Sequence, residues 1–311
     1  MDDGTSGPLK VAVTGAGGFV GRALVKVLEA DPRAEVRALG RAQLGDLSAD
    51  TDWGPALEGI DVVVHLAARV HVRDRAEEQF QRINVEASAS LARAAARLGV
   101  GRMVFLSSAA VMGDRDLGRP FNERDRPQPV SVYAQSKLMA EGVLRDIADS
   151  EGVELVILRP PTVYGIGAAG DWRTLLRLCR LPIPLPFGCA DNRRSMVSVV
   201  NLCDVIRLAT RHPDVASRTF FVSDEEVLSV AETIRTIRRA LGKPEWLVPV
   251  PLRLLRLCIS RCPGGAAPAR ILSNFEIDAS TLHEMIGWRS VERAETGLTR
   301  MAQWFDGAPR E

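Results

Sequence analysis

The sequence lacks the features that mark a nucleic-acid-binding or membrane-spanning protein. Its 311 residues carry 40 lysines and arginines against 39 aspartates and glutamates, a formal net charge of +1, with no long block of either sign. This balance argues against nucleic acid as a partner. Apolar runs all fall short of the ~20 residues of a membrane-spanning helix, so we expect no integral membrane segment.

Cysteine and histidine are also scarce. The five cysteines and four histidines form no CxxC pair and no cluster with zinc-ligand spacing, so we expect reduced thiols and no metal site. The N-terminus carries Asp2 and Asp3 where a secretory signal would be positively charged. These features predict a cytoplasmic protein. Hydrophobic residues at 46% and charged residues at 25% are typical of a folded globular chain.

Short apolar runs alternate with helical patterns through the first half of the chain, which predicts an α/β fold with a doubly wound parallel sheet (Rossmann) over residues 9–165. The expected strands are 10–14, 35–39, 61–65, 102–107 and 154–159, and the expected helices are 21–30, 76–98 and 133–150. Prolines interrupt this rhythm beyond Arg159. A smaller, partly interleaved C-terminal α/β substrate domain is therefore expected over residues 166–308.

The first predicted strand runs directly into a turn with glycines at Gly15, Gly18 and Gly21, a GxxGxxG spacing. Glycine permits a tight turn and lets the backbone approach a pyrophosphate, which would lie at the positive N-terminal end of the next helix. A glycine-rich turn without a nucleotide is the alternative. The strand before the turn and the helix after it favour dinucleotide binding.

Tyr133 and Lys137 lie four residues apart at the start of a predicted helix, so their side chains share one face. A neighbouring ammonium favours the phenolate and moves a tyrosine toward useful acid–base chemistry at neutral pH. The same spacing occurs by chance on many helices. Ser108, at the end of a predicted strand, adds a hydroxyl that could hydrogen-bond a reacting carbonyl oxygen.

Several motifs together resemble the extended short-chain dehydrogenases/reductases, and within them the NAD-dependent epimerase/dehydratase family that acts on nucleotide sugars. They are the Gly15 to Gly21 turn, Asp46-Leu47, His65-Leu66-Ala67-Ala68, Asn84-Val85, Ser107-Ser108, Tyr133-Ala134-Gln135-Ser136-Lys137 and Arg159-Pro160-Pro161-Thr162-Val163-Tyr164-Gly165. The resemblance spans about Lys10 to Phe305. It implies that Tyr133 is the acid/base, that Lys137 holds the nicotinamide ribose and lowers the tyrosine's pKa, and that Ser108 contacts the sugar oxygen.

The resemblance also implies a cofactor-lining set, namely Gly15, Gly18, Phe19, Val20, Gly21, Asp46, Leu47, Leu66, Ala67, Ala68, Asn84 and Pro161. Ordinary packing is the alternative role for the two alanines. The second predicted strand ends Leu39-Gly40-Arg41, without the carboxylate that would bind the ribose 2′-hydroxyl of NAD. Arg41 could instead bind a 2′-phosphate, or could be a solvated loop residue. We expect NADP(H) in preference to NAD(H).

The residues after Ser108 bear on the reaction. Family dehydratases have an Asp-Glu pair there, whereas this chain has Ala109-Ala110, so elimination of water is not expected. The remaining reaction is hydride transfer at C4 of a nucleotide sugar, with UDP as the expected carrier, by a 4-keto-sugar reductase or a 4-epimerase. Met112, where family epimerases commonly have tyrosine, together with Arg41, favours the reductase. A 4-epimerase with tightly bound NAD is the alternative.

Substrate contacts are expected from the second domain. Arg194 resembles a family arginine that binds the substrate diphosphate, with Arg193, His71 and Arg270 as further candidates; each of these three could equally be structural. A dehydrogenase of hydrophobic alcohols is disfavoured by the paired arginines. A non-catalytic NAD(P)-sensing protein is disfavoured because both Tyr133 and Lys137 are present.

Three predicted helical regions concern partners. By resemblance, the helices at about 76–98 and 133–150 pair between subunits, so a homodimer is expected. Residues 252–261 form a basic amphipathic segment that fits either a membrane surface or an ordinary helix packed on the second domain. We favour the packed helix.

Overall fold

The larger part of the molecule is built on a six-stranded parallel sheet. The structure is a computed structural model that describes residues 7–70, 77–261 and 270–308. The strands stand in the order β2-β1-β3-β4-β5-β9, and each neighbouring pair is parallel. Their bounds are β1 Leu9–Thr14, β2 Ala34–Leu39, β3 Val62–His65, β4 Arg102–Leu106, β5 Glu154–Arg159 and β9 Thr219–Phe221. The predicted doubly wound sheet is confirmed, and its strand order reverses between β1 and β3, where dinucleotides bind in such folds.

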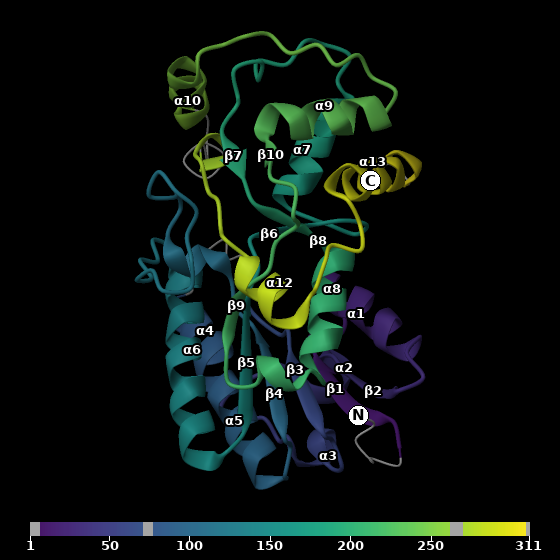
Figure 1. Cartoon of the computed structure of the whole chain (residues 1–311), viewed down its shortest axis with the longest axis vertical. Coiled ribbons are helices and arrows are strands. Elements are labelled where there is room, and N and C mark those ends of the chain that lie inside the picture. The colour runs from purple at the N-terminus through teal and green to yellow at the C-terminus, as the bar shows by residue number, and fades with distance from the viewer. Residues whose placement is uncertain (1–6, 71–76, 262–269, 309–311) are drawn as a thin grey trace.

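Helices cover both faces of this sheet (Figure 1). The helices α1 (Phe19–Glu29) and α8 (Val199–Ala209) pack on one face, and α5 (Ala87–Arg97) and α6 (Val132–Glu151) pack on the other. Alternate residues of β1 point to opposite faces, so Val11 and Val13 join the α1 and α8 core while Ala12 joins the α5 and α6 core. Burial on both faces explains why the strands are continuous apolar runs.

The long helix predicted over 76–98 is divided into three parts. It consists of α4 (Glu77–Phe80), the π-helical segment η1 (Gln81–Glu86) and α5. The π-helical turn widens the helix around Asn84, which is buried. Irregular turns of this kind often lie at functional sites.

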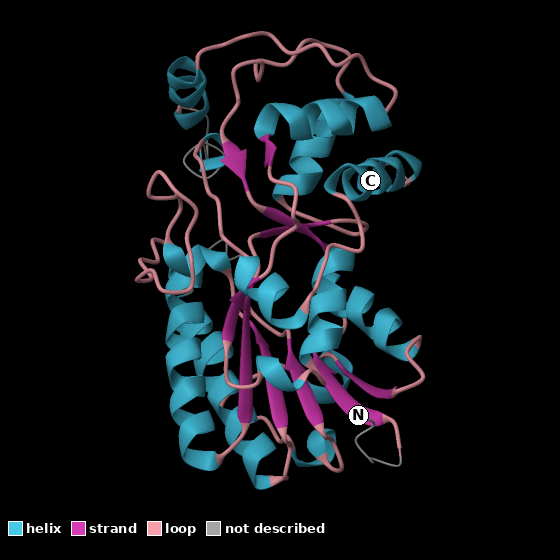
Figure 2. Ribbon diagram, viewed as in Figure 1, coloured by secondary structure: helices cyan, strands magenta, loops and turns pink. Residues whose placement is uncertain are grey.

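The C-terminal part of the chain builds a second layer of structure above the carboxyl ends of the strands (Figure 2). Two short sheets are present, β6 (Thr162–Tyr164) with β8 (Met196–Ser198) and β7 (Arg193–Arg194) with β10 (Leu228–Ser229). Their helices are α7 (Asp171–Arg180), α9 (Val230–Ala240), α10 (Leu252–Ser260), α12 (Ser280–Ile286) and α13 (Ala294–Gly307). The chain returns to the main sheet in α8 and β9 between these elements, which is the interleaving expected from the sequence.

Short helices complete the connections. They are α2 (Arg41–Leu44), α3 (Gly54–Leu57), η2 (Ala109–Met112), η3 (Pro213–Val215) and η4 (Arg270–Leu272). Over the described ranges, no helix combines the length and the apolar content needed to cross a bilayer.

Candidate active site and cofactor cavity

The glycine-rich turn packs too tightly for any other residue at two of its positions. Gly15 has a φ of +70°, and a Cβ atom there would lie 2.7 Å from the amide nitrogen of Ala67. At Gly21, a Cβ atom would lie 2.2 Å from the carbonyl oxygen of Gly15. The turn is therefore pressed between the start of α1 and the segment after β3. The first amide groups of α1 have no partner within the helix and suit an anion.

A cavity of about 460 Å³ opens beside this turn, at the strand-order reversal. Predicted cofactor residues that line it are Gly15, Gly18, Arg41, Asp46, Leu47, Leu66, Ala67 and Ala68. The remaining five, Phe19, Val20, Gly21, Asn84 and Pro161, do not line it. Residues that sequence reasoning missed include Gly17, Gly40, Arg69 and Ile83. Gly17 and Gly40 directly adjoin predicted residues, whereas Arg69 and Ile83 carried no motif of their own.

The chemistry of the lining fits a dinucleotide. The Nε atom of Arg69 is buried in the cavity wall and has no hydrogen-bond partner within the described part of the chain. A buried donor without a partner is costly and is satisfied by an acceptor on a bound ligand. The glycine turn brings its backbone to the same cavity. Both features suit the phosphates of NAD or NADP.

Arg41 and Asp46 face each other at the mouth of this cavity. The Nε atom of Arg41 lies 3.2 Å from Oδ1 of Asp46, and both side chains are more than four-fifths exposed. An ion pair this exposed contributes little to stability. Either side chain can therefore exchange its partner for a ligand group, the arginine for a 2′-phosphate or the aspartate for a ribose hydroxyl.

Ser108, Tyr133 and Lys137 come together at the carboxyl end of β4. Ser131 caps α6, since its Oγ accepts a hydrogen bond from the amide of Ala134 at 3.2 Å, and this fixes the first helical turn that carries Tyr133. Burial raises the pKa of Tyr133, while a hydrogen bond with the Ser108 hydroxyl lowers it. Ser108, whose Oγ also accepts a 3.2 Å hydrogen bond from the Ala110 amide, is thus close enough to Tyr133 to affect its pKa.

Lys137 lies one helical turn below Tyr133 and is almost fully buried. Its Nζ donates a 2.8 Å hydrogen bond to the carbonyl oxygen of Leu106 and lies 4.5 Å from the centre of the Phe105 ring. Burial lowers the pKa of Lys137 to about 7, whereas the charge of Glu141 acts to raise it. The pKa of Lys137 therefore lies close to neutral pH, where small changes in its surroundings alter its protonation.

Asn84 supports the site from behind the cavity. Its side-chain oxygen accepts a 2.7 Å hydrogen bond from the amide of Arg69, and its nitrogen donates to the Arg69 carbonyl and to Ser136 Oγ. Ser136 in turn donates to the carbonyl oxygen of Tyr133. Asn84 thus links a segment of the cavity wall to the helix that carries the tyrosine. The resemblance implied a direct cofactor contact; the structure gives Asn84 these positioning contacts.

Two adjacent arginines take different directions on β7. The guanidinium of Arg194 lies 5.4 Å from the centre of the Phe275 ring and donates to the Ser273 carbonyl, and burial lowers its pKa to about 10 against the charges of Asp114 and Asp116. Arg193 is half-exposed and donates to the carbonyl oxygen of Val227. His71 lies outside the described residues, and Arg270 begins η4.

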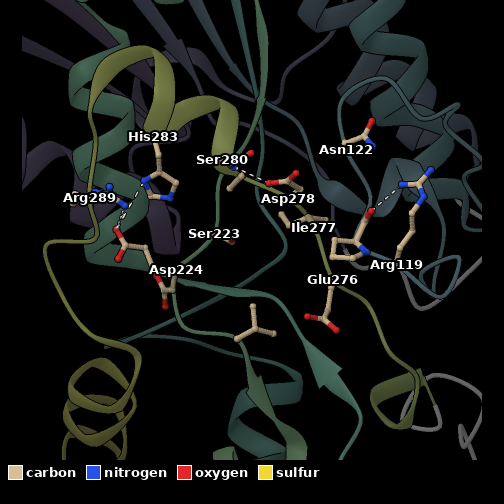
Figure 3. Close-up of a pocket in the computed structure, with 14 residues that line it drawn as sticks. Arg119, Asn122, Ser223, Asp224, Glu276, Ile277, Asp278, Ser280, His283 and Arg289 are labelled. Atoms are coloured by element: carbon tan, nitrogen blue, oxygen red, sulfur yellow. Dashed lines mark hydrogen bonds and ion pairs between the residues drawn. The ribbon is translucent and has the colours of Figure 1, made fainter.

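A second, larger cavity of about 620 Å³ lies between the two layers, near α12 and the loop after β9 (Figure 3). Charges of both signs line it, including Arg119, Arg289, Asp224 and Glu276. Ser108, Tyr133 and Lys137 line neither this cavity nor the cofactor cavity. The trio is joined to the wall of the cofactor cavity through Asn84, which bonds both Arg69 and Ser136. We take the trio and that cavity together as the candidate active site.

Comparison with known proteins agrees with this geometry. Residues 11–222 match the NAD dependent epimerase/dehydratase family. The chain is 36% identical over 314 residues to a UDP-glucose 4-epimerase of Vibrio cholerae, an alignment that covers 96% of each chain. It is 27% identical over 259 residues, 79% of this chain and 77% of the relative, to an N-acetyl-alpha-D-glucosaminyl-diphospho-ditrans,octacis-undecaprenol 4-epimerase of Escherichia coli O157:H7.

A solved structure shares the whole fold. The UDP-glucuronic acid 4-epimerase of Bacillus cereus in complex with NAD superposes with a TM-score of 0.76 at 18% identity and covers 96% of this chain and 98% of its own. At that identity the likeness concerns the fold alone.

The active-site groups, the cofactor cavity and these matches define an NAD(P)-dependent enzyme of the extended short-chain dehydrogenase/reductase class. The chain belongs to the NAD dependent epimerase/dehydratase family. The preference for a reductase over an epimerase, which the sequence suggested through Arg41 and Met112, finds no support in the relatives. Met112 is fully buried in an apolar cluster with Phe121 and Phe221, which explains its presence through packing.

Proposed function

We propose that the protein interconverts the C4 epimers of a UDP-linked hexose. The observation that carries this is the grouping of Ser108 with Tyr133 and buried Lys137, two residues of a helix that Asn84 ties to the wall of the cofactor cavity. The residues directly after Ser108 are the two alanines that begin η2, so no carboxylate stands at that position to eliminate water. The Vibrio cholerae relative, which is named a UDP-glucose 4-epimerase and aligns over 96% of its length, supports the same reaction.

The chain's own residues supply the proton chemistry. Tyr133, as a phenolate, would take the proton of the sugar O4 and so become a phenol, and it would return that proton once the sugar has turned over. The Ser108 hydroxyl holds the same oxygen in both orientations through a hydrogen bond. Lys137, when protonated, would stabilise the phenolate that precedes this proton transfer. A bound nicotinamide would accept a hydride from C4 and give it back to the opposite face of the sugar.

Substrate phosphates are assigned to Arg194. Its guanidinium is held in place by the Phe275 ring and the Ser273 carbonyl, an arrangement that presents a rigid cation rather than a mobile one. Replacing Arg194 with alanine should raise the KM for UDP-glucose with a smaller change in kcat. Arg193→Ala is the matched control, because Arg193 turns toward Val227 and Glu276.

A 4-keto-sugar reductase that uses NADP(H) is the second candidate. Arg41 favours it, since this side chain stands at the cavity mouth where an NAD enzyme of this fold would place a carboxylate. Asp46 at the same mouth supports NAD instead. The choice of cofactor and the choice of reaction are therefore linked.

One experiment separates the two reactions. Freshly purified protein is denatured and the released nucleotide identified by mass spectrometry, and the native enzyme is then given UDP-glucose or UDP-N-acetylglucosamine without added cofactor. Epimerisation predicts retained NAD and a mixture of C4 epimers. An empty or NADP(H)-exchanging site, with NADPH consumed by a 4-keto sugar and no epimer formed, would replace the epimerase with the reductase.

The homodimer expected by resemblance is proposed through α5 and α6. These helices pack side by side, and Met139 on α6 and Leu98 at the end of α5 are exposed apolar side chains on them. Replacing Met139 with glutamate should shift the protein from dimer to monomer in light scattering. An unchanged mass would reject this interface.

A further inference from the structure

Exposed apolar side chains gather at the end of the molecule farthest from the main sheet. Of the fourteen large apolar residues exposed in the described part of the chain, six lie in three short stretches there, 181–183, 246–248 and 254–257. We call them the distal patch, and they are Leu181, Ile183, Trp246, Val248, Leu254 and Leu257. Scattered exposed apolar residues are ordinary, but a cluster marks an interaction surface.

The loops of the distal patch are fixed to each other. The buried side chain of Arg238 donates hydrogen bonds to the carbonyl oxygens of Ile183 and Pro244, 3.0 Å from Nη1 and 2.5 Å from Nε respectively. Leu185 pairs with Leu247 between the two loops through backbone hydrogen bonds. The side chain of Leu185 then points into the core, while Trp246 is 60% exposed. The apolar residues are thus held outward by a rigid frame.

The helix α10 continues this surface. Leu255 packs into the same core as Leu185 and Leu247, as a packed helix should. Leu254 and Leu257, three residues apart and so neighbours on one helical face, remain about half exposed. Packing on the second domain therefore accounts for only one side of α10.

The charge on α10 has one sign, whereas Glu245 beside Trp246 is paired with Arg239 and Arg180 beside Leu181 is paired with Asp306. Residues 246–275 contain four arginines and neither aspartate nor glutamate. Arg253, Arg256 and Arg261 are exposed on or beside α10. A chain with a net charge of +1 has thus concentrated positive charge at one apolar surface. Apolar and aromatic groups bordered by arginines match an anionic lipid headgroup layer, into which such a helix inserts in the plane of the membrane.

From this coincidence of exposed leucine, tryptophan and arginine we infer that the distal patch binds the surface of an anionic lipid bilayer. The enzyme would then rest on the membrane through α10 and the Trp246 loop, with the active site on the side away from the lipid. This inference concerns localisation and is independent of the sugar or cofactor used.

Vesicle binding by the full-length protein tests it directly. The protein should sediment with vesicles of phosphatidylcholine mixed with phosphatidylglycerol, weakly with phosphatidylcholine alone, and less as salt is raised. Trp246 also reports the contact, because its fluorescence should shift to shorter wavelength and be quenched by brominated lipid. In a Trp246→Phe variant the protein should still bind while most of that optical signal disappears.

Matched substitutions separate the patch from general stickiness. Leu254→Ser combined with Leu257→Ser should lower partitioning onto anionic vesicles about tenfold or more, whereas Val291→Ser, at an equally exposed valine outside the patch, should not. Arg253→Glu should lower it about tenfold, whereas Lys26→Glu on α1 should have little effect. Thermal unfolding and the nucleotide content confirm that each variant is folded.

The inference is overturned if the wild type does not bind anionic vesicles, or if the patch and control variants lose binding equally. If the wild type does not bind and its oligomeric state changes when Trp246 or the two leucines are replaced, the patch is instead a contact between copies of this chain.

Discussion

Arg159, the last residue of β5, binds both carboxylate oxygens of Glu141 on α6, 2.9 Å from Nε and 2.5 Å from Nη2. Both side chains are buried. Ser107, directly before Ser108, donates a 2.5 Å hydrogen bond to the same carboxylate. Because Glu141 follows Lys137 by one helical turn, this ion pair joins β5 and the end of β4 to the helix that carries Tyr133 and Lys137.

We expect Glu141→Gln to be strongly destabilising. Burial acts to raise the pKa of Glu141, but the hydrogen bonds and charge of Arg159 outweigh it and hold that pKa below its ordinary value. Removing one charge of a buried pair leaves the other unpaired, at a cost of about 3–5 kcal/mol in the free energy of unfolding. Urea denaturation measures this cost. Glu226→Gln, in an exposed pair with Arg293, is the control and should change stability by about 1 kcal/mol or less.

Activity gives a second measurement on the same variant. The charge of Glu141 raises the pKa of Lys137, so its loss should lower that pKa and move the alkaline limb of the kcat profile to lower pH. A purely structural role for Glu141 predicts fewer folded molecules with an unshifted profile. That result would remove the electrostatic link to Lys137.

Tyr133→Phe removes the proposed acid/base group and its hydrogen bond with Ser108. We expect kcat to fall by about 10²–10⁴-fold with the affinity for the nucleotide nearly unchanged, since the phenol moves the proton and does not hold the cofactor. The two-tyrosine composition of the chain offers a sharp control. Tyr164→Phe deletes a buried 2.6 Å hydrogen bond to Asp224 and should lower stability without a comparable fall in kcat. Equal turnover in wild type and Tyr133→Phe would remove Tyr133 from the chemistry.

The buried lysine makes the stability of the cofactor-free protein depend on pH. Burial lowers the pKa of Lys137 from 10.5 to about 7 in the folded state, whereas the unfolded chain keeps the higher value. Between these two values the unfolded state binds a proton that the folded state does not. The free energy of unfolding should therefore rise as the pH increases from about 7 toward about 10.

Lys137→Met should flatten this rise, and urea denaturation at a series of pH values measures the slope. Lys26→Met is the control, because Lys26 is an exposed lysine on α1 and should leave the slope as in the wild type. The same slope in wild type and Lys137→Met would show that another group causes the dependence.

The sequence could predict those features whose signal is local. The strands β1, β3 and β5 are short apolar runs that end at glycines, at polar residues or in prolines. In the turn after β1, Gly15 has a positive φ, and a Cβ atom at Gly21 would clash with the carbonyl oxygen of Gly15 six residues earlier. Tyr133 and Lys137 are four residues apart on one helix, so their common face follows from helical geometry alone.

The remaining features depend on contacts between distant segments. The six-stranded sheet is completed by β9, three residues that carry no stronger pattern than other short apolar runs. Glu141 reads as one more polar residue on an amphipathic helix until β5 brings Arg159 against it. The exposed side of α10 could not be separated from its buried side, because Leu254, Leu255 and Leu257 are chemically equivalent in the sequence and only tertiary packing distinguishes them.

Arg41 and Asp46 allow a direct test of the cofactor preference, because both side chains are exposed at the cofactor cavity. If its guanidinium exchanges Asp46 for a 2′-phosphate, Arg41→Ala should weaken NADPH binding by about tenfold or more, since a hydrogen bond to a charged group is worth about 1.5–3 kcal/mol. NADH, which lacks that phosphate, serves as the internal control and should bind as in the wild type.

Asp46→Asn should act in the opposite sense, because it weakens NADH binding through the ribose hydroxyl while leaving Arg41 free to bind NADPH. Titration calorimetry with both nucleotides measures the ratio, and an unchanged preference in Arg41→Ala would leave Asp46 and NAD as the pair that the cavity recognises.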